Sequence, residues 1–210
     1  MVTFLIDALY AFFHVTCIGC KKIRISNDND VICNQCVASI TSVIPVVLAQ
    51  KPSVTVYALA KYEGVLKALL NGKYYSQTHG YRWFSKKISK YIQQHGMSYD
   101  VIIPVSQHPV KRIFRYFNHA SYMASIIGKE CGILIYDYVC CTLLSNQASK
   151  TFEQRKLTKN SFIFYGDVDV LIGKRVLIID DVMTTGSTLS SFLSVLPKKA
   201  TYDIFVVART

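Results

Sequence analysis

A buried strand that ends on two adjacent carboxylates constrains this chain more than any other feature of its sequence. Residues 176–179 are apolar and rich in β-branched side chains, as in a strand covered on both faces. After Asp180 and Asp181 comes a short turn of glycine and hydroxyl residues. Beyond it, apolar residues three and four positions apart predict a helix: Leu189, Phe192, Leu193 and Leu196. This order directs N–H groups and hydroxyls toward one point at the positive end of a helix dipole, where an anion binds.

The same segment indicates the kind of anion. It contains no Gly-Lys-Ser/Thr of a Walker loop and no Gly-x-Gly-x-x-Gly fingerprint. Paired carboxylates would repel a bare polyphosphate, but they would accept hydrogen bonds from the vicinal hydroxyls of a ribose 5-phosphate. The alternative is a Rossmann-like strand end whose carboxylates are solvated turn residues. The residues predicted to bind are Asp180, Asp181, Val182, Met183, Thr184, Thr185, Gly186, Ser187 and Thr188.

Two Cys-x-x-Cys pairs near the start of the sequence predict a metal site. Twelve residues separate Cys17 and Cys20 from Cys33 and Cys36. Four thiolates arranged in two pairs suit tetrahedral zinc, here in a structural role. A redox role lacks the expected βαβ context, and a disulfide scaffold is disfavoured because no secretory signal is evident. The other cysteines (Cys131, Cys140 and Cys141) lie among apolar residues and are interpreted as buried thiols.

The rest of the sequence alternates strands and helices, which predicts an α/β fold with a mostly parallel sheet flanked by helices. Strands are expected over 54–60, 101–105, 133–139, 162–165, 175–180 and 202–208, and helices over 63–70, 82–94 and 120–129. We expect an N-terminal helix and four-cysteine zinc-ribbon module over residues 1–50. A larger domain over 51–210 would hold the anion site. In such sheets ligands bind beyond the carboxyl ends of the strands.

Composition favours anionic partners. The 210 residues carry a formal net charge of +11, and 51% are hydrophobic against 18% charged, so extended disorder is excluded. Residues 1–15 are apolar but too short to cross a bilayer, and the spacing of Leu5, Leu9, Phe12 and Phe13 predicts an amphipathic helix. We therefore expect a cytoplasmic protein without a transmembrane segment.

Both motifs together resemble the ComF/GntX (ComFC) competence family, which joins a four-cysteine zinc module to a type I phosphoribosyltransferase domain. Residues 176–188 are similar to its phosphoribosyl-pyrophosphate (PRPP) signature, and residues 103–119 to its "PVP…R…RGFNQ" segment. Residues 61–73 and 147–162 are similar to its "Y…G…LK…K" and "Q…ER…N…F" segments. Two departures are Tyr116, where the family has glycine, and His119, where it has glutamine.

The resemblance implies that PRPP binds together with Mg²⁺. It also implies a pyrophosphate-binding set of Ser106, Lys73, Lys111, Arg112 and Arg115. A type I transferase displaces pyrophosphate from the anomeric carbon through an oxocarbenium-like transition state. No residue in the sequence marks a pocket for the acceptor base.

Three functions follow from these features. The first is a PRPP-binding protein of natural competence that handles incoming single-stranded DNA, peripheral to the inner membrane with the DNA-uptake machinery. The second is a nucleobase-salvage phosphoribosyltransferase, which needs no zinc module. The third is a zinc-dependent nucleic-acid-binding protein with a vestigial PRPP site. Candidate DNA contacts are Lys21, Lys22, Arg24, Arg82, Trp83, Lys86 and Lys90, although residues 82–90 also fit a solvated helix face with Trp83 in the core.

Overall fold

A computed structural model of the chain describes residues 17, 19–22, 32–40, 44–47, 53–70, 74–105, 118–141 and 162–210. The predicted N-terminal amphipathic helix lies outside these residues. Among the described helices, none combines the length and the apolar composition that crossing a membrane requires.

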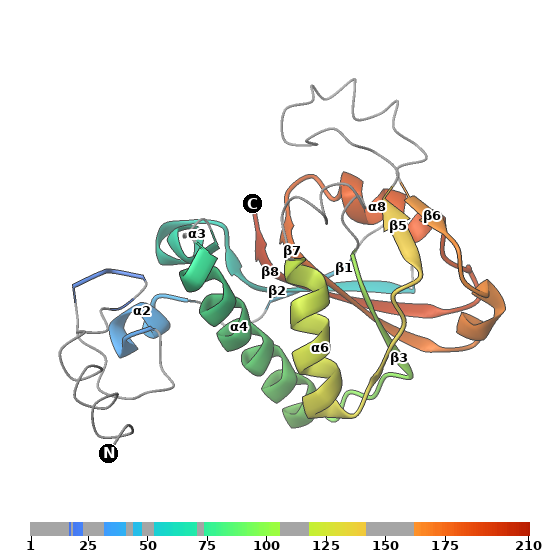
Figure 1. Cartoon of the computed structure of the whole chain (residues 1–210), viewed down its shortest axis with the longest axis horizontal. Helices are drawn as coiled ribbons and strands as arrows, with labels where there is room; N and C mark the ends of the chain where they lie inside the picture. Colours follow the sequence, from blue (N-terminus) through green and yellow to red (C-terminus); the bar gives the residue numbers. More distant parts are fainter. Residues whose placement is uncertain are drawn as a thin grey trace, which may run out of the picture.

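A six-stranded sheet in the order β1-β2-β8-β7-β3-β4 forms the centre of the molecule (Figure 1). Every pairing in it is parallel except that of β1 with β2. The strands are β1 (Ile44–Val47), β2 (Val54–Lys61), β3 (Val101–Pro104), β4 (Leu134–Ile135), β7 (Arg175–Met183) and β8 (Thr201–Arg209). The expected mostly parallel sheet is therefore confirmed.

Each face of the sheet has its own core. On β7, Leu177 and Ile179 point to one face while Val176 and Ile178 point to the other, because side chains alternate along a strand. The first face packs against three helices and forms what we call the α4-side core: α3 (Gly64–Leu70), α4 (Tyr74–Gln94) and α6 (His119–Cys131). The second face forms the α8-side core with α8 (Ser187–Ser194) and a two-stranded ribbon of β5 (Val139–Cys141) and β6 (Phe162–Phe164). The predicted flanking helices thus cover both faces.

Local signals account for the helices of the α4-side core. In α4, the buried residues Tyr81, Phe84 and Ile88 recur at intervals of three and four, so one stripe of the helix faces the sheet. In α6, the Asn118 side chain accepts hydrogen bonds from the N–H groups of Ala120 and Ser121. Gly132 ends this helix with a φ of 68°, a left-handed conformation that suits glycine. A short helix α2 (Asn34–Ala38) and a 3-10 turn η2 (Val168–Leu171) complete the described elements.

Three boundaries differ from the sequence-based prediction. The single strand expected over 133–139 is two short strands, β4 and β5, which belong to different sheets. Helix α4 begins at Tyr74, not near residue 82. The segment 40–50, which its apolar residues and Pro45 do not predict as a strand, contains β1 at the edge of the sheet, where proline is tolerated.

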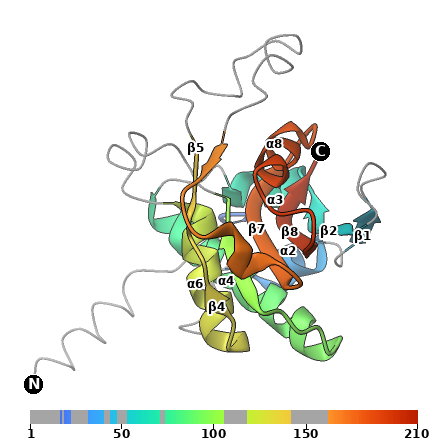
Figure 2. The same ribbon diagram turned by 90° about the vertical axis from the view of Figure 1, so that its right-hand side faces the viewer.

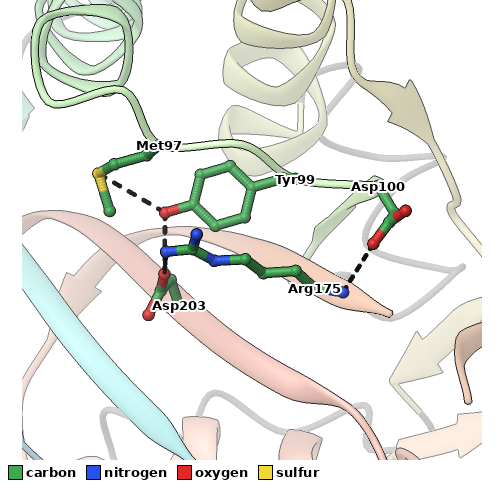
Figure 3. Close-up of polar contacts among 5 residues, drawn as sticks. All are labelled: Met97, Tyr99, Asp100, Arg175 and Asp203. Carbon is green, nitrogen blue, oxygen red and sulfur yellow. Dashed lines mark hydrogen bonds and ion pairs between the residues drawn. The ribbon is translucent and has the colours of Figure 1, made fainter. Parts of the chain in front are cut away.

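The amino ends of β7 and β8 are joined by a network of polar contacts (Figure 3). The buried Asp203 carboxylate accepts hydrogen bonds from the Tyr99 hydroxyl at 3.0 Å and from the Arg175 guanidinium at 3.1 Å. The guanidinium also lies over the Tyr99 ring, 5.1 Å from its centroid. Asp100 accepts from the Arg175 N–H at 2.8 Å and from the Lys174 ammonium at 3.3 Å. These contacts pair both carboxylates of this end with cations.

Candidate functional site

The carboxyl end of β7 presents two neighbouring carboxylates. Asp180 follows the buried Ile179 and is itself only 9% exposed. Its Oδ1 accepts a hydrogen bond from the Asp181 N–H at 2.9 Å, and the Asp181 Oδ1 accepts from the Val182 N–H at 2.7 Å. Each carboxylate is thereby held close to the backbone that follows it. Among the described residues, no cation forms an ion pair with either of them.

Burial and mutual repulsion dominate the electrostatics of this pair. Burial raises the pKa of Asp180 well above its usual range, and the negative charge of Asp181 raises it further, while the Asp181 N–H partly opposes both effects. A carboxyl in this setting gains from hydrogen-bond donors or a cation supplied by a ligand. The strand end is therefore suited to receive a ligand that carries hydroxyl groups.

The turn after β7 is built around Gly186. Its φ of 71° is left-handed, and no described atom lies within 4 Å of the position that a Cβ would take. Helix α8 starts directly after it, and the Ser190 N–H closes the first turn onto the Gly186 carbonyl at 2.8 Å. The N–H groups at the start of a helix lack partners within the helix and so can bind an anion.

Hydroxyl groups surround the same turn. The Thr185 hydroxyl donates to the Ser187 hydroxyl at 3.0 Å, and the Ser187 N–H donates to Thr185 Oγ1 at 3.4 Å. The side chains of Thr184, Thr185 and Ser187 are exposed, whereas Leu189, at the next turn of α8, is buried. The predicted residues 180–188 thus run without interruption from the buried Asp180 to the exposed hydroxyl groups of the turn.

The regular alternation of three neighbouring strands is interrupted at one level, just beyond Asp180. Leu59 and Ala60 on β2 both belong to the α4-side core, as do Val207 and Ala208 on β8. On β7, Asp180 continues the face of Val176 and Ile178, which belong to the α8-side core. Val182 would share that face if the alternation continued, but it packs against the α4-side core. The side-chain alternation of β2, β7 and β8 is thus broken where these strands pair beyond Asp180.

Tyr81 on α4 lies within electrostatic reach of the carboxylates and was not predicted as a site residue. Burial raises the pKa of its phenol, and the charges of Asp181 and Asp180 raise it further, so the hydroxyl stays protonated. Its ring stacks on His119, the first residue of α6, with ring centroids 4.2 Å apart. The sequence offered little signal, because Tyr81 sits on the same apolar stripe as Phe84 and Ile88.

The predicted pyrophosphate-binding residues lie outside the described residues: Lys73, Ser106, Lys111, Arg112 and Arg115. The structure does show where the segment that contains Ser106, Lys111, Arg112 and Arg115 begins. Pro104 at the end of β3 is paired with Ile179 on β7, and the Val105 N–H donates to the Ile179 carbonyl at 2.8 Å. The chain therefore leaves β3 beside the Asp180 end of β7, at the edge where ligands bind in such sheets.

The four predicted cysteine ligands form a cluster. The sulfur atoms of Cys17, Cys20, Cys33 and Cys36 all lie within 4.8 Å of one another, and the Cys20–Cys33 distance is 3.9 Å. Four sulfurs at Zn–S bonds of about 2.3 Å in a tetrahedron would be about 3.8 Å apart. The donor set and its size therefore fit a tetrahedral metal ion.

Backbone groups favour the thiolate state at Cys17, whereas burial and the neighbouring thiols raise the pKa of Cys36. The Cys33 N–H donates to Cys17 Sγ at 3.3 Å. Burial raises the pKa of Cys17, but hydrogen bonds from the Cys33 and Cys20 backbones and from neighbouring thiols outweigh it and lower the pKa to about 6. Lys21 follows the first pair with a φ of 58°, and its N–H donates to the Cys17 carbonyl at 2.7 Å. A tight turn thus aims Cys17 and Cys20 at one point.

The cysteine cluster is packed on the α4-side core. Cys17, Cys33 and Cys36 are buried in that core together with Leu66 and Leu69 of α3. A Cβ at Gly19 would come within 2.7 Å of a Val65 methyl group and 3.0 Å of Cys36 Sγ, so only glycine fits this contact. The metal site and helix α3 therefore share one packed interface.

Comparisons with solved structures find similarity to several phosphoribosyltransferases. The chain is similar to a purine phosphoribosyltransferase from Pyrococcus horikoshii Ot3 (20% identity, 65% of this chain and 85% of that one, TM-score 0.36). It is also similar to a phosphoribosyltransferase from Corynebacterium diphtheriae (14% identity, 73% and 70%, TM-score 0.36). A glutamine PRPP amidotransferase from B. subtilis matches at 16% identity and a TM-score of 0.37.

The present chain spans 26% of the B. subtilis protein, and that protein matches 60% of the present chain. No protein-family model matches the sequence, and no curated protein matches it. At these identities and TM-scores, nothing about activity or substrate carries over from the solved structures to this chain.

Proposed function

We propose that the chain binds PRPP with Mg²⁺ at the carboxyl end of β7, as a protein of phosphoribosyltransferase type. One observation carries the proposal: the buried Asp180 and the half-buried Asp181 are adjacent carboxylates with no ion-pair partner among the described residues, directly before an open turn at a helix start. Buried charges are normally paired, so an uncompensated pair at a strand end indicates a ligand.

Each part of the site has a part of the ligand to bind. The carboxylates would accept hydrogen bonds from the two ribose hydroxyls. The 5-phosphate would lie against residues 184–188, where the α8 amides and the hydroxyl side chains converge. The pyrophosphate would lie toward the segment after β3, with Lys73, Ser106, Lys111, Arg112 and Arg115 as its proposed contacts. Mg²⁺ supplies positive charge that neutralises the departing pyrophosphate when it is bound.

Isothermal titration with PRPP and Mg²⁺ tests this proposal. We expect Asp180→Asn with Asp181→Asn to lower the affinity at least a hundredfold, because each lost charge-assisted hydrogen bond costs about 1.5–3 kcal/mol. The matched control is Asp100→Asn, which replaces a carboxylate beside the opposite end of β7 and should leave the affinity unchanged. Equal affinity of the wild type and the double variant would refute the proposal.

Nucleobase salvage is the alternative reaction of the same site. It is tested by measuring pyrophosphate release from PRPP with a panel of purine and pyrimidine bases. Release that depends on one base and is lost in the Asp180→Asn, Asp181→Asn variant would favour salvage. PRPP binding without release for any base would favour a binding protein.

We also propose that the cysteine cluster holds one structural zinc ion. Cys17, Cys20, Cys33 and Cys36 have the number, type and spacing of ligands that zinc prefers. Cys33→Ser should lower the zinc content to near zero and loosen the packing around Val65, because such sites fold with their metal. Elemental analysis that finds no zinc in the native protein would contradict this assignment.

The ComF/GntX resemblance supports a finer proposal, a role in natural competence through contact with incoming single-stranded DNA. Lys21, Lys22, Arg82, Lys86 and Lys90 are all exposed, as a phosphate-binding surface requires. Trp83, however, is half-buried, packs edge-on against Phe84 at 5.2 Å, and has the Lys87 ammonium over its ring at 5.1 Å. We therefore assign the contact to charge and not to base stacking on Trp83.

Anisotropy of labelled oligonucleotides over a salt series tests the DNA contact. Binding should weaken steeply with salt, and Arg82→Gln with Lys86→Gln should reduce both the affinity and its salt dependence. A Trp83→Phe variant should bind as the wild type does. Absence of binding at low salt would refute the proposed DNA contact. Arg24, which lies outside the described residues, is a further predicted contact.

A further inference from the structure

The β5–β6 ribbon buries one face and exposes the other. Val139 and Phe162 are buried in the α8-side core, where Phe162 meets Phe192 edge-on at 5.1 Å. The antiparallel register pairs Val139 with Phe164 and Cys140 with Ile163, and the Tyr165 N–H donates to the Tyr138 carbonyl at 3.0 Å. Because side chains alternate, Tyr138, Ile163 and Tyr165 share the outer face. They are 43%, 56% and 59% exposed.

The outer face is held in a fixed shape. The Tyr138 ring lies 4.4 Å from Tyr136 and 5.6 Å from Tyr165. The Tyr136 hydroxyl donates to the Asp167 carbonyl and the Tyr165 hydroxyl to the Asp137 carbonyl, both at 2.9 Å. A Cβ at Gly166 would come within 2.8 Å of Tyr138, so the chain passes directly under this ring. Aromatic side chains fixed in this way lose little conformational entropy when they bind a partner.

The described residues of this region carry a charge opposite to that of the chain. Residues 134–141 and 162–172 contain the three carboxylates Asp137, Asp167 and Asp169 and no lysine or arginine, in a protein of net charge +11. The side chains of Asp167 and Asp169 are exposed. Such a surface repels nucleic acid and phosphate, and both its carboxylates and the faces of its tyrosine rings attract cations.

We propose that this acidic aromatic surface, formed by Asp137, Tyr138, Ile163, Tyr165, Asp167 and Asp169, docks an extended arginine- or lysine-rich segment of another polypeptide. Exposed apolar side chains rimmed by one sign of charge are typical of protein interfaces. Among the described strands, β5 and β6 pair only with each other, so each has an edge to which an extended segment can add. Figure 2, which looks onto this side of the molecule, shows the ribbon standing clear of the main sheet.

A second copy of the chain fits this surface less well. The exposed cations Arg82, Lys86 and Lys90 lie on α4, which covers the opposite face of the sheet. A contact between two different faces of identical chains leaves one of each face free and does not close into a dimer. Charge complementarity thus favours a basic segment of a different protein.

Anisotropy of a fluorescein-labelled nine-residue peptide of alternating arginine and valine, added to the full chain, tests the proposal. We expect salt-sensitive binding that is absent for the glutamate–valine counterpart. Asp167→Asn with Asp169→Asn should weaken it about three- to tenfold, and Ile163→Ser by a similar factor. In the double variant, the asparagine at position 167 still has a side-chain oxygen to accept the N–H of residue 169, so the 3-10 turn η2 should persist.

The matched control is Glu63→Gln, which removes one exposed carboxylate before α3, outside the acidic aromatic surface. It should leave the affinity unchanged. Failure of the wild type to bind the peptide, or an equal loss in Glu63→Gln, would overturn the proposal. Light scattering tests whether the chain associates with itself. Self-association that is abolished by Asp167→Asn with Asp169→Asn would also overturn the proposal, because a second copy of the chain would then occupy the surface.

Discussion

The two ends of the parallel sheet carry the same type of side chain in opposite electrostatic settings. At the amino end of the strands, Asp203 is paired with Arg175 and Asp100 with Lys174. At the carboxyl end, Asp180 and Asp181 lie next to each other, and no described cation forms an ion pair with them. The N–H of Arg175 and the Lys174 ammonium lower the pKa of Asp100, whereas burial and a neighbouring charge raise the pKa of Asp180.

If the proposed ligand binds at the carboxyl end, this difference separates stability from binding within one sheet. Paired carboxylates at one end hold β7, β8 and the residues before β3 together. Carboxylates without an ion pair among the described residues, as at the other end, cost free energy in the unliganded protein, and a ligand that brings donors or a cation recovers it. Variants at the two ends should therefore affect different measurements.

The largest effect on stability should come from the amino end. Asp203→Ala removes the acceptor for the Tyr99 hydroxyl and for the Arg175 guanidinium, so we expect a loss of about 2–4 kcal/mol in the free energy of unfolding. PRPP affinity at a temperature where the variant is folded should not change. Urea unfolding and calorimetry check the two parts, and a fall in affinity would show that the two ends are coupled.

The two left-handed glycines that flank β7 give a matched pair. Gly173 (φ 73°) precedes the strand and Gly186 (φ 71°) follows it, and neither has a described atom within 4 Å of its Cβ position. Alanine at either position should cost about 1–2 kcal/mol through the backbone alone. Only Gly186→Ala should also weaken PRPP binding, by about tenfold, because its Cβ would meet the ligand. Equal affinities of the two variants would place the phosphate elsewhere.

The smallest effect should be a gain of stability at the binding end. The pKa of Asp180 is raised above its unfolded value of about 3.9, so the folded state binds this proton more tightly. The free energy of unfolding then falls as pH rises from about 4 through the raised pKa. Asp180→Asn should remove this slope and gain about 0.5–2 kcal/mol at neutral pH, with the gain vanishing below pH 4 or so. Unfolding curves measured at several pH values check this prediction. A wild type whose free energy of unfolding does not fall over this pH range would contradict the raised pKa of Asp180.

Local patterns in the sequence were enough to predict the strand, the turn and the helix at the carboxyl end of β7. The apolar run of β7, the acidic pair and the glycine turn are contiguous, and each is read from its immediate neighbours. The strand proved longer than predicted, continuing to Met183, because its pairing with β8 extends to Arg209. The four cysteines were equally predictable, since their spacing alone indicates a cluster.

The amino end could not be predicted because its partners are far apart in the sequence. Tyr99 and Asp203 are separated by 104 residues, and Asp203 lies in a strand that is mostly apolar, where nothing local indicates its partners. Tyr81 was missed for a related reason, since an aromatic residue on an apolar helix stripe is usually core. Contacts between residues far apart in the sequence can be identified only once the fold is known.

The outer strands of the sheet affect how the protein behaves at high concentration. One rim is β1, which includes Pro45, and the other is β4, only two residues long. A proline has no N–H to offer an incoming strand, and a two-residue strand offers too few. Neither rim is a good template for another chain, so the sheet resists growing into a larger one by lateral addition. Among the described strands, the open edges suited to an added strand are thus those of the β5–β6 ribbon and not those of the central sheet.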